Sequence, residues 1–170
     1  VASSGEGATL DGKGGTGLFY LDGGCSLTLR GLLLVNGRAY HGGVVEAIYA
    51  GDVEIIDSTI RDCRADDDGG VVYAWNSGAV SISSSNVSGC SAWAGGVVYA
   101  FYSESLSIAG IAFIDNRADR SGSVLYLSST PSSISDASFT GNTAGDDKTI
   151  QTDKPIDWDC RLGSWMQTEG

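Results

Sequence analysis

The residues GGVVYA occur twice in this chain, at Gly69–Ala74 and at Gly95–Ala100, and the near copy GGVVEA lies at Gly42–Ala47. The copies begin 27 and 26 residues apart. Self-similarity at a fixed period of roughly 20–50 residues is typical of chains that stack one small unit on the next, because a single unit cannot bury its apolar face alone. The spacing therefore restricts the fold more than any other feature of the sequence.

Around these copies the chain divides into repeated blocks. Four blocks of 20 residues align without a gap, and an earlier block fits after a one-residue slip: Val44–Cys63, Val71–Cys90, Val97–Asn116 and Ser123–Asn142, preceded by Gly17–Asn36. Each block contains three short strand-like runs, and alternation of apolar and polar residues predicts strands with one buried face. Matching positions should stack into inward columns, of which we expect two: Val45, Val72, Val98 and Val124, and Ile55, Ile82, Ile108 and Ile134.

The composition favours strands, because the chain has 25 Gly, many Ser and β-branched residues, and no long stretch of helix formers. We predict an all-β fold, a right-handed single-stranded parallel β-helix of about five coils, each with 26–27 residues and three strands. It would occupy residues 1–147, with 1–15 as an N-terminal partial coil or cap, and residues 148–170 would form a C-terminal cap or the start of a further module. The alternative is a leucine-rich-repeat horseshoe, but the segments between blocks are too short for its helices.

The repeats also resemble a known family. The GGVV runs, together with FIDN at Phe113–Asn116 and FTGN at Phe139–Asn142, resemble the G-G-A-I and F-x-x-N signatures of polymorphic outer membrane protein-type repeats. The opening TLDGKGGTGLFYLDGGCSLTLRGLLLVNG is similar to the start of β-helical, pectin-lyase-like surface proteins. The resemblance covers roughly residues 7–144 and departs at IRDC and VSGC, where Cys replaces Asn. It implies an extracellular or cell-surface structural or adhesive segment, and no enzyme.

Two columns of the first strand carry aromatic residues. The third position of the blocks reads Phe19, Glu46, Tyr73, Tyr99 and Leu125, and the fifth reads Leu21, Ile48, Trp75, Phe101 and Leu127. An unpaired carboxylate in a stacked core is costly, so Glu46 favours columns that face outward. We predict an interface or ligand-binding surface formed by Phe19, Tyr73, Trp75, Tyr99, Phe101 and Tyr102, with Tyr49 at its edge. The alternative is that this face packs under a loop or is itself core.

The third strand of each block is followed by Asn or Cys, and this column predicts a structural ladder at a corner: Asn36, Cys63, Cys90, Asn116 and Asn142. Cys63 and Cys90 would lie about 4.8 Å apart, within the range of a disulfide, although the ladder does not require one. Nothing pairs Cys25 with Cys160. The triplet NVS makes Asn86 a candidate glycosylation site, because inward Val87 leaves Asn86 facing solvent.

Charge and residue types narrow the function. A net charge of −11 argues against a nucleic-acid partner, and no apolar run reaches the roughly 20 residues of a membrane helix. His41 is the only histidine, and we expect no cofactor and no metal; the acidic corner RADDDGG could hold Ca²⁺, but a solvated turn is the simpler interpretation. We predict a non-enzymatic extracellular or cell-surface module that contacts other protein subunits or surface glycans, with end-to-end or side-by-side assembly. The alternative is a carbohydrate-binding or glycan-active protein of the lyase or hydrolase kind.

Overall fold

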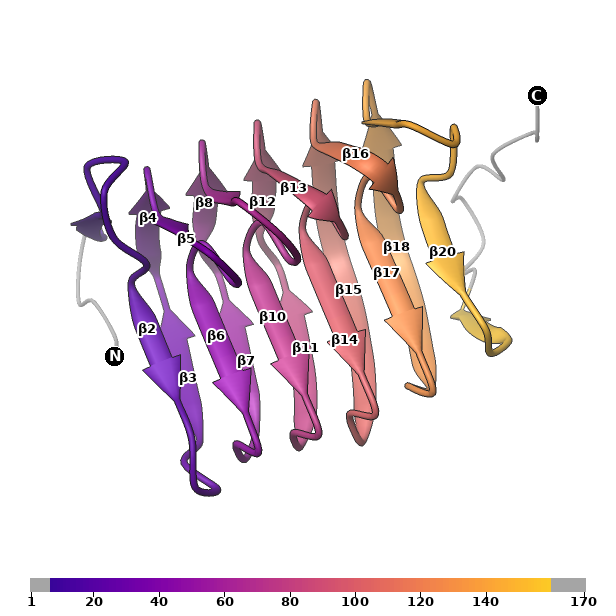
Figure 1. The fold of residues 1–170 in the computed structure, drawn as a ribbon, viewed down its shortest axis with the longest axis horizontal. Helices are drawn as coiled ribbons and strands as arrows, with labels where there is room; N and C mark the ends of the chain where they lie inside the picture. The colour runs from indigo at the N-terminus through magenta and orange to yellow at the C-terminus, as the bar shows by residue number, and fades with distance from the viewer. Residues whose placement is uncertain (1–6, 160–170) are drawn as a thin grey trace.

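In the computed structural model, residues 7–159 are described, and this part of the chain consists of strands and turns without a helix. The strands wind into coils that stack along one long axis, so that the chain progresses from one end of a rod to the other (Figure 1). The strand pairs are parallel, and each strand pairs with its counterpart one repeat further along the chain. The predicted parallel β-helix is confirmed, and the helices that a leucine-rich-repeat horseshoe requires are absent from residues 7–159.

Three sheets run along the rod. The first has ten strands: β1 Ala8–Asp11, β3 Leu27–Arg30, β4 Leu32–Val35, β7 Val53–Ile56, β8 Thr59–Arg61, β11 Ala79–Ser83, β12 Asn86–Ser88, β15 Ser105–Ile114, β18 Ser132–Thr140 and β21 Ile156–Asp159. The second has six: β2 Phe19–Leu21, β6 Val45–Ile48, β10 Val72–Trp75, β14 Val98–Phe101, β17 Leu125–Ser128 and β20 Ile150–Thr152. The third has five: β5 Arg38–Ala39, β9 Arg64–Ala65, β13 Ser91–Ala94, β16 Arg117–Ser121 and β19 Thr143–Ala144.

In-register pairing stacks like residues inside the rod. The predicted isoleucine column is confirmed, since Ile55, Ile82, Ile108 and Ile134 pair in sequence and are at most 2% exposed. The predicted valine column holds for its first three members, but β14 pairs Val98 with Leu125 rather than Val124. The predicted alignment sets only the first strand of the fourth block one residue too early, because Gly122 takes the left-handed place of Gly95 and Ser123 takes that of Gly96.

The glycine pair in GGVV has two different roles at the corner that leads into the second sheet. Gly69 has φ of 69°, in the left-handed region that glycine enters without steric cost. Gly70 has no room for a side chain, since an added Cβ would overlap the carbonyl oxygen of Gly96 on the next coil. The corner then turns Val71 and Val72 both into the core, where each is fully buried.

The solenoid extends beyond the predicted boundary at residue 147. Strands β20 and β21 stack in parallel register on β17 and β18 and carry the coil to Asp159. At the other end β1 pairs with β4 and supplies a partial coil. Residues 160–170, including Cys160, and residues 1–6 lie outside the described residues.

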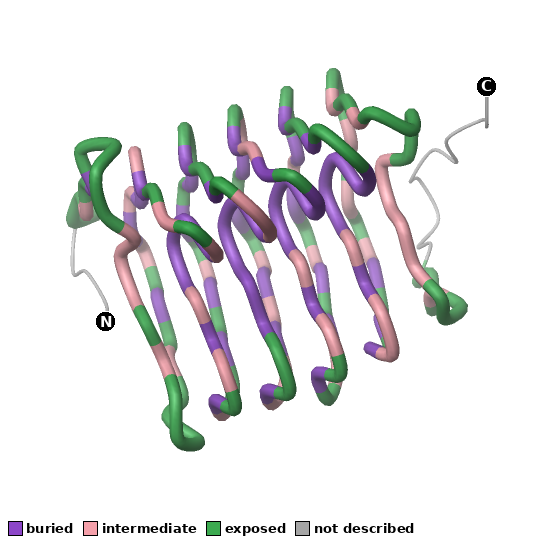
Figure 2. Tube along the Cα trace, in the orientation of Figure 1, coloured by how far each residue is buried: buried purple, intermediate pink, exposed green. Residues whose placement is uncertain are grey.

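Burial is strongest in the middle of the rod, where each coil has a neighbour on both sides (Figure 2). Within residues 7–159 the first and last coils are more exposed, since only one of their faces stacks on another described coil. No helix in residues 7–159 is long and apolar enough to cross a membrane.

Candidate functional site

One outward column of the second sheet is a stack of aromatic rings. Tyr73, Tyr99 and Tyr126 pair in register, with ring centroids 5.5 Å and 5.0 Å apart and nearly parallel planes. His41 stacks on the free face of Tyr73 at 4.3 Å. We call this set, His41, Tyr73, Tyr99 and Tyr126, the tyrosine stack.

The stack faces outward, as Glu46 predicts, but it is not freely exposed. Tyr73 retains only 8% of its accessible surface, because rings cover both of its faces. Burial raises the pKa of Tyr99 to about 12, and the charge of Asp68 adds to the effect. Tyr73 is therefore not an exposed contact residue, and its burial comes from the rings of His41 and Tyr99 rather than from a covering loop or the core.

In both end blocks the strand of the second sheet is displaced by one residue from the predicted alignment. Phe19 pairs with Val45 and packs against the core, so its prediction as an interface residue is wrong. Its neighbour Tyr20 pairs with Glu46 and takes the outward place, with 61% exposure. At the other end Tyr126, rather than Leu125, continues the column. The signal for the second shift is the corner glycine, Gly122, which fixes the position of the strand that follows.

A second aromatic set lies where the second sheet ends. Trp75 and Phe101 pair in register and face outward, and Tyr49 and Tyr102 follow β6 and β14 directly. Tyr49 packs beside Trp75 at 6.2 Å between centroids, and Tyr102 meets Phe101 edge-on at 4.4 Å. Tyr49, Trp75 and Tyr102 are 61%, 38% and 57% exposed. We call Tyr49, Trp75, Phe101 and Tyr102 the aromatic edge.

The turn that carries the aromatic edge passes through the left-handed region on successive coils, at Tyr49, Asn76, Tyr102 and Ser129. Tyr49 and Tyr102 have φ of 49° and 53°, in the left-handed region where a bulky side chain is disfavoured. On the coils between and beyond them the same turn holds Asn76 and Ser129, with φ of 47° and 51°. Asn tolerates this conformation through its short polar side chain. The exposed Asn76 thus lies between two exposed tyrosines on successive coils.

The second half of the predicted Asn and Cys ladder is a chain of hydrogen bonds inside the rod. The backbone N–H of Cys90 donates to Oδ1 of Asn116 at 3.0 Å, and the N–H of Asn116 donates to Oδ1 of Asn142 at 2.9 Å. Asn116 Nδ2 donates to the Val87 carbonyl at 3.1 Å. In the first half of the ladder the thiols of Cys63 and Cys90 donate to the carbonyl oxygens of Arg61 and Ser88, each at 3.4 Å. Both thiols are free and fully buried.

Asn36 does not belong to this ladder, because β4 pairs Leu34 with Ile60 and so places Gly37, not Asn36, beside Cys63. Asn36 lies at the preceding turn with φ of 54°. Its Nδ2 donates to Oδ1 of Asp11 at 2.9 Å, which lowers the pKa of that carboxyl.

The predicted glycosylation triplet lies on β12. Asn86 is exposed while Val87 beside it is buried, in keeping with the alternation that the sequence predicts. The NVS triplet is therefore sterically open to modification, and its glycosylation stays a prediction.

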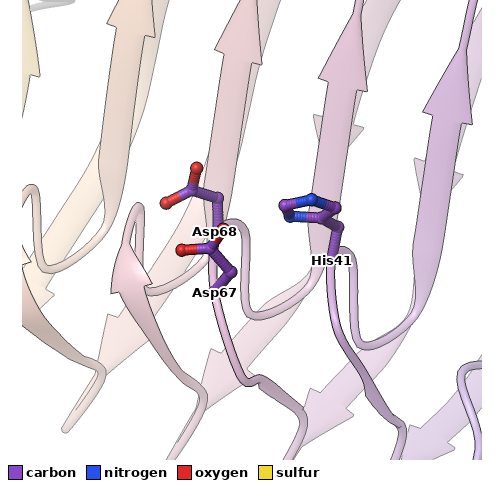
Figure 3. Close-up of side chains that lie close together, drawn as sticks. All are labelled: His41, Asp67 and Asp68. Carbon is purple, nitrogen blue, oxygen red and sulfur yellow. The ribbon is translucent and has the colours of Figure 1, made fainter.

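A mixed cluster of His41, Asp67 and Asp68 lies at the corner that leads into the second sheet (Figure 3). One ligand atom from each residue lies within 4.8 Å of the others, and all three side chains are half-buried. The sequence interpretation of RADDDGG as a fully solvated turn is wrong for Asp67 and Asp68. Aligning the corner glycines Gly42 and Gly69 would have placed His41 beside Asp68.

These features define a class of protein: a single-chain parallel β-solenoid with a polar ladder inside and aromatic side chains on one outer face. The family described as a right-handed β-helix region matches residues 5–152. The chain belongs to this family. No curated protein and no solved structure matches it.

Proposed function

We propose that the chain is a non-enzymatic extracellular module that attaches to surface glycans through the aromatic edge. The observation that carries the proposal is the pair Tyr49 and Tyr102, whose φ angles lie in the left-handed region although they are bulky and exposed. Each such residue costs about 1–3 kcal/mol, and strain of this kind is concentrated at functional sites.

The size and chemistry of the edge favour sugars over a protein surface. A stable protein interface buries roughly 800 Å² on each partner, from about 20–30 residues, whereas the edge offers four aromatic side chains. The apolar C–H face of a pyranose ring packs on an aromatic ring, whose face carries partial negative charge. The exposed amide of Asn76 lies between the two tyrosines and can donate to, and accept from, sugar hydroxyls.

Two carboxylates that follow Tyr49 in the chain serve as hydrogen-bond acceptors between coils. Oδ1 of Asp52 accepts from the N–H of Ala79 at 2.9 Å, and Glu54 accepts from the Thr28 hydroxyl at 3.1 Å. Glycoside hydrolysis would need two carboxyl groups about 5–10 Å apart on either side of the scissile bond, and the proposal of binding rests on the aromatic edge rather than on such a pair. The extracellular location rests on the resemblance to polymorphic outer membrane protein-type repeats and on the open glycosylation triplet at Asn86.

The test is binding of the purified chain to an array of surface glycans, followed by titration calorimetry with the best ligand. The variant with Tyr49, Trp75 and Tyr102 all changed to Ala should lose binding while keeping its circular dichroism spectrum. The matched control changes Tyr40 and Trp93 to Ala, since these are exposed to 66% and 48% but lie in or next to the third sheet. Binding that survives the triple change, or that the control removes equally, would refute the role of the edge. Release of sugar products would favour the glycan-active alternative.

A further inference from the structure

The cluster of His41, Asp67 and Asp68 joins two consecutive coils. His41 and Asp68 occupy equivalent positions, each directly before the corner glycine, and the N–H of Gly42 donates to the Asp68 carbonyl at 3.1 Å. The N–H of Asp67 donates to the Tyr40 carbonyl at 2.8 Å, which fixes the second carboxylate in the same corner. On the following coil the equivalent residue is Ala94, which pairs with Asp68 and carries no polar side chain.

Within residues 7–159 the His41 ring lacks a hydrogen-bond partner that would account for its placement. The Nδ1 atom of His41 is buried and has no hydrogen-bond partner among the described residues. None of the ion pairs in residues 7–159 includes Asp67 or Asp68, whereas their neighbour Asp66 pairs with Arg38 at 2.9 Å. Asp67 and Asp68 are adjacent half-buried carboxylates, and a positive ion between them would offset the repulsion of their like charges.

We propose that His41, Asp67 and Asp68 bind one divalent transition-metal ion, for which Zn²⁺ is the best match. One imidazole nitrogen and two carboxylate oxygens suit Zn²⁺, and water would complete four-coordination. Ligands held at about 2.0–2.2 Å from one ion lie about 3–4 Å apart, so side-chain rotations of the two aspartates close the observed separation of up to 4.8 Å. The His41 ring is already held by its stack on Tyr73 at 4.3 Å.

The three ligands determine which ions the site prefers and what a bound ion does to the rod. Ca²⁺ and Mg²⁺ prefer six or more oxygen ligands, so a set with one nitrogen and two carboxylates should bind them weakly. The ion would neutralise the two aspartates and cross-link adjacent coils at the start of β6 and β10. It therefore acts on the rod itself and does not depend on the aromatic edge.

The experiment is titration calorimetry of the purified, chelator-treated chain with ZnCl₂, with CaCl₂ as comparison, and thermal unfolding with and without Zn²⁺. We expect one site per chain and a higher Tm with Zn²⁺. Asp68→Asn and Asp67→Asn, which keep the side-chain size, should each weaken binding by more than about tenfold. His41→Phe keeps a ring against Tyr73 but removes the nitrogen, and it should weaken binding similarly. The control Asp66→Asn changes the neighbouring carboxylate of the same turn and should bind Zn²⁺ like the original chain.

Substitution with CoCl₂ adds a readout that does not depend on stability. Four-coordinate Co²⁺ bound through nitrogen and oxygen should show visible absorption that His41→Phe abolishes. The proposal is overturned if Zn²⁺ does not bind, if CaCl₂ binds as well as ZnCl₂, or if Asp66→Asn weakens binding as much as Asp68→Asn. The last two results would mean that the acidic surface attracts cations without a built site.

Discussion

The polar ladder gives the sharpest prediction about stability, through Asn116→Ala. Asn116 is fully buried, accepts from the N–H of Cys90 and donates to the Val87 carbonyl. Alanine would leave both backbone groups buried without a partner, and each such group costs about 1–3 kcal/mol. Because some relaxation or water entry lowers the sum, we expect a loss of about 3 kcal/mol in the free energy of unfolding.

The assay is urea unfolding followed by tryptophan fluorescence, because Trp75 and Trp93 lie on the coil that Asn116 contacts through Cys90. The m-value must stay unchanged, since a solenoid can lose cooperativity and unfold in parts. Asn86→Ala, an exposed Asn on β12, serves as the control and should change stability by less than about 0.5 kcal/mol. Asn116→Cys should lose less than Asn116→Ala, because a thiol fills this place at Cys90. If Asn116→Ala lowers the free energy of unfolding by less than about 1 kcal/mol at constant m, the reasoning that the Cys90 N–H and the Val87 carbonyl are both left without a partner is refuted.

Three further outcomes follow from individual residues. Gly69→Ala should cost at least about 2 kcal/mol, since φ is 69° and the Cβ would overlap the Val72 carbonyl oxygen, whereas Gly15→Ala, which meets open space, should be nearly neutral in urea unfolding. The pKa of Tyr99 is raised to about 12, so the neutral side chain stabilises the fold below pH 10, and this contribution is lost as the pH rises from 10 to 12. The Tm of the chain should therefore fall over this pH range, and Tyr99→Phe should remove part of that fall. An equal fall in Tm for the variant and the original chain would contradict the raised pKa. Iodoacetamide should label exposed Cys25 in the native chain but not Cys90, whose thiol is fully buried with its pKa raised by that burial; equal labelling by peptide mass spectrometry would count against the buried ladder.

The repeat predicted the coil and its inward columns because stacking enforces strict periodicity on residues such as Ile82. It placed the ends of the alignment wrongly at Phe19 and Tyr126. The reason is that coil length changes at turns, where a residue is added or lost without disturbing the sheets: the paired residues Val98 and Leu125 are separated by one more position than the paired residues Leu106 and Ser132. Anchoring the fourth block on its corner glycine rather than on its valine would have given the correct register.

Whether the side chains of a column point outward and how far they are exposed to solvent are separate properties. The sequence predicted only the direction in which they point. Glu46 correctly indicated that the column containing Tyr73 faces outward, but the burial of Tyr73 depends on how rings from neighbouring coils stack on it. Those contacts are set by side-chain geometry, which alternation does not encode. The same limit applies to His41 and Asp68, whose proximity follows from the stacking of one coil on the next.

The two proposed sites lie at opposite ends of the same strand, and this separation makes their independence testable. The metal cluster precedes β10 and Trp75 of the aromatic edge ends it, so the four residues of the strand at roughly 3.3 Å each, or about 13 Å, span the distance between them. Substitutions farther apart than about 7–10 Å without a shared partner usually have additive effects, and in a solenoid each coil transmits strain mainly to its neighbours. Asp68→Asn should therefore leave glycan binding unchanged, and Tyr102→Ala should leave Zn²⁺ affinity unchanged. If a substitution at one site changes binding at the other, the stack of His41, Tyr73 and Tyr99 transmits a rearrangement along the second sheet. That result would contradict the expectation that a structural change at one corner stays local.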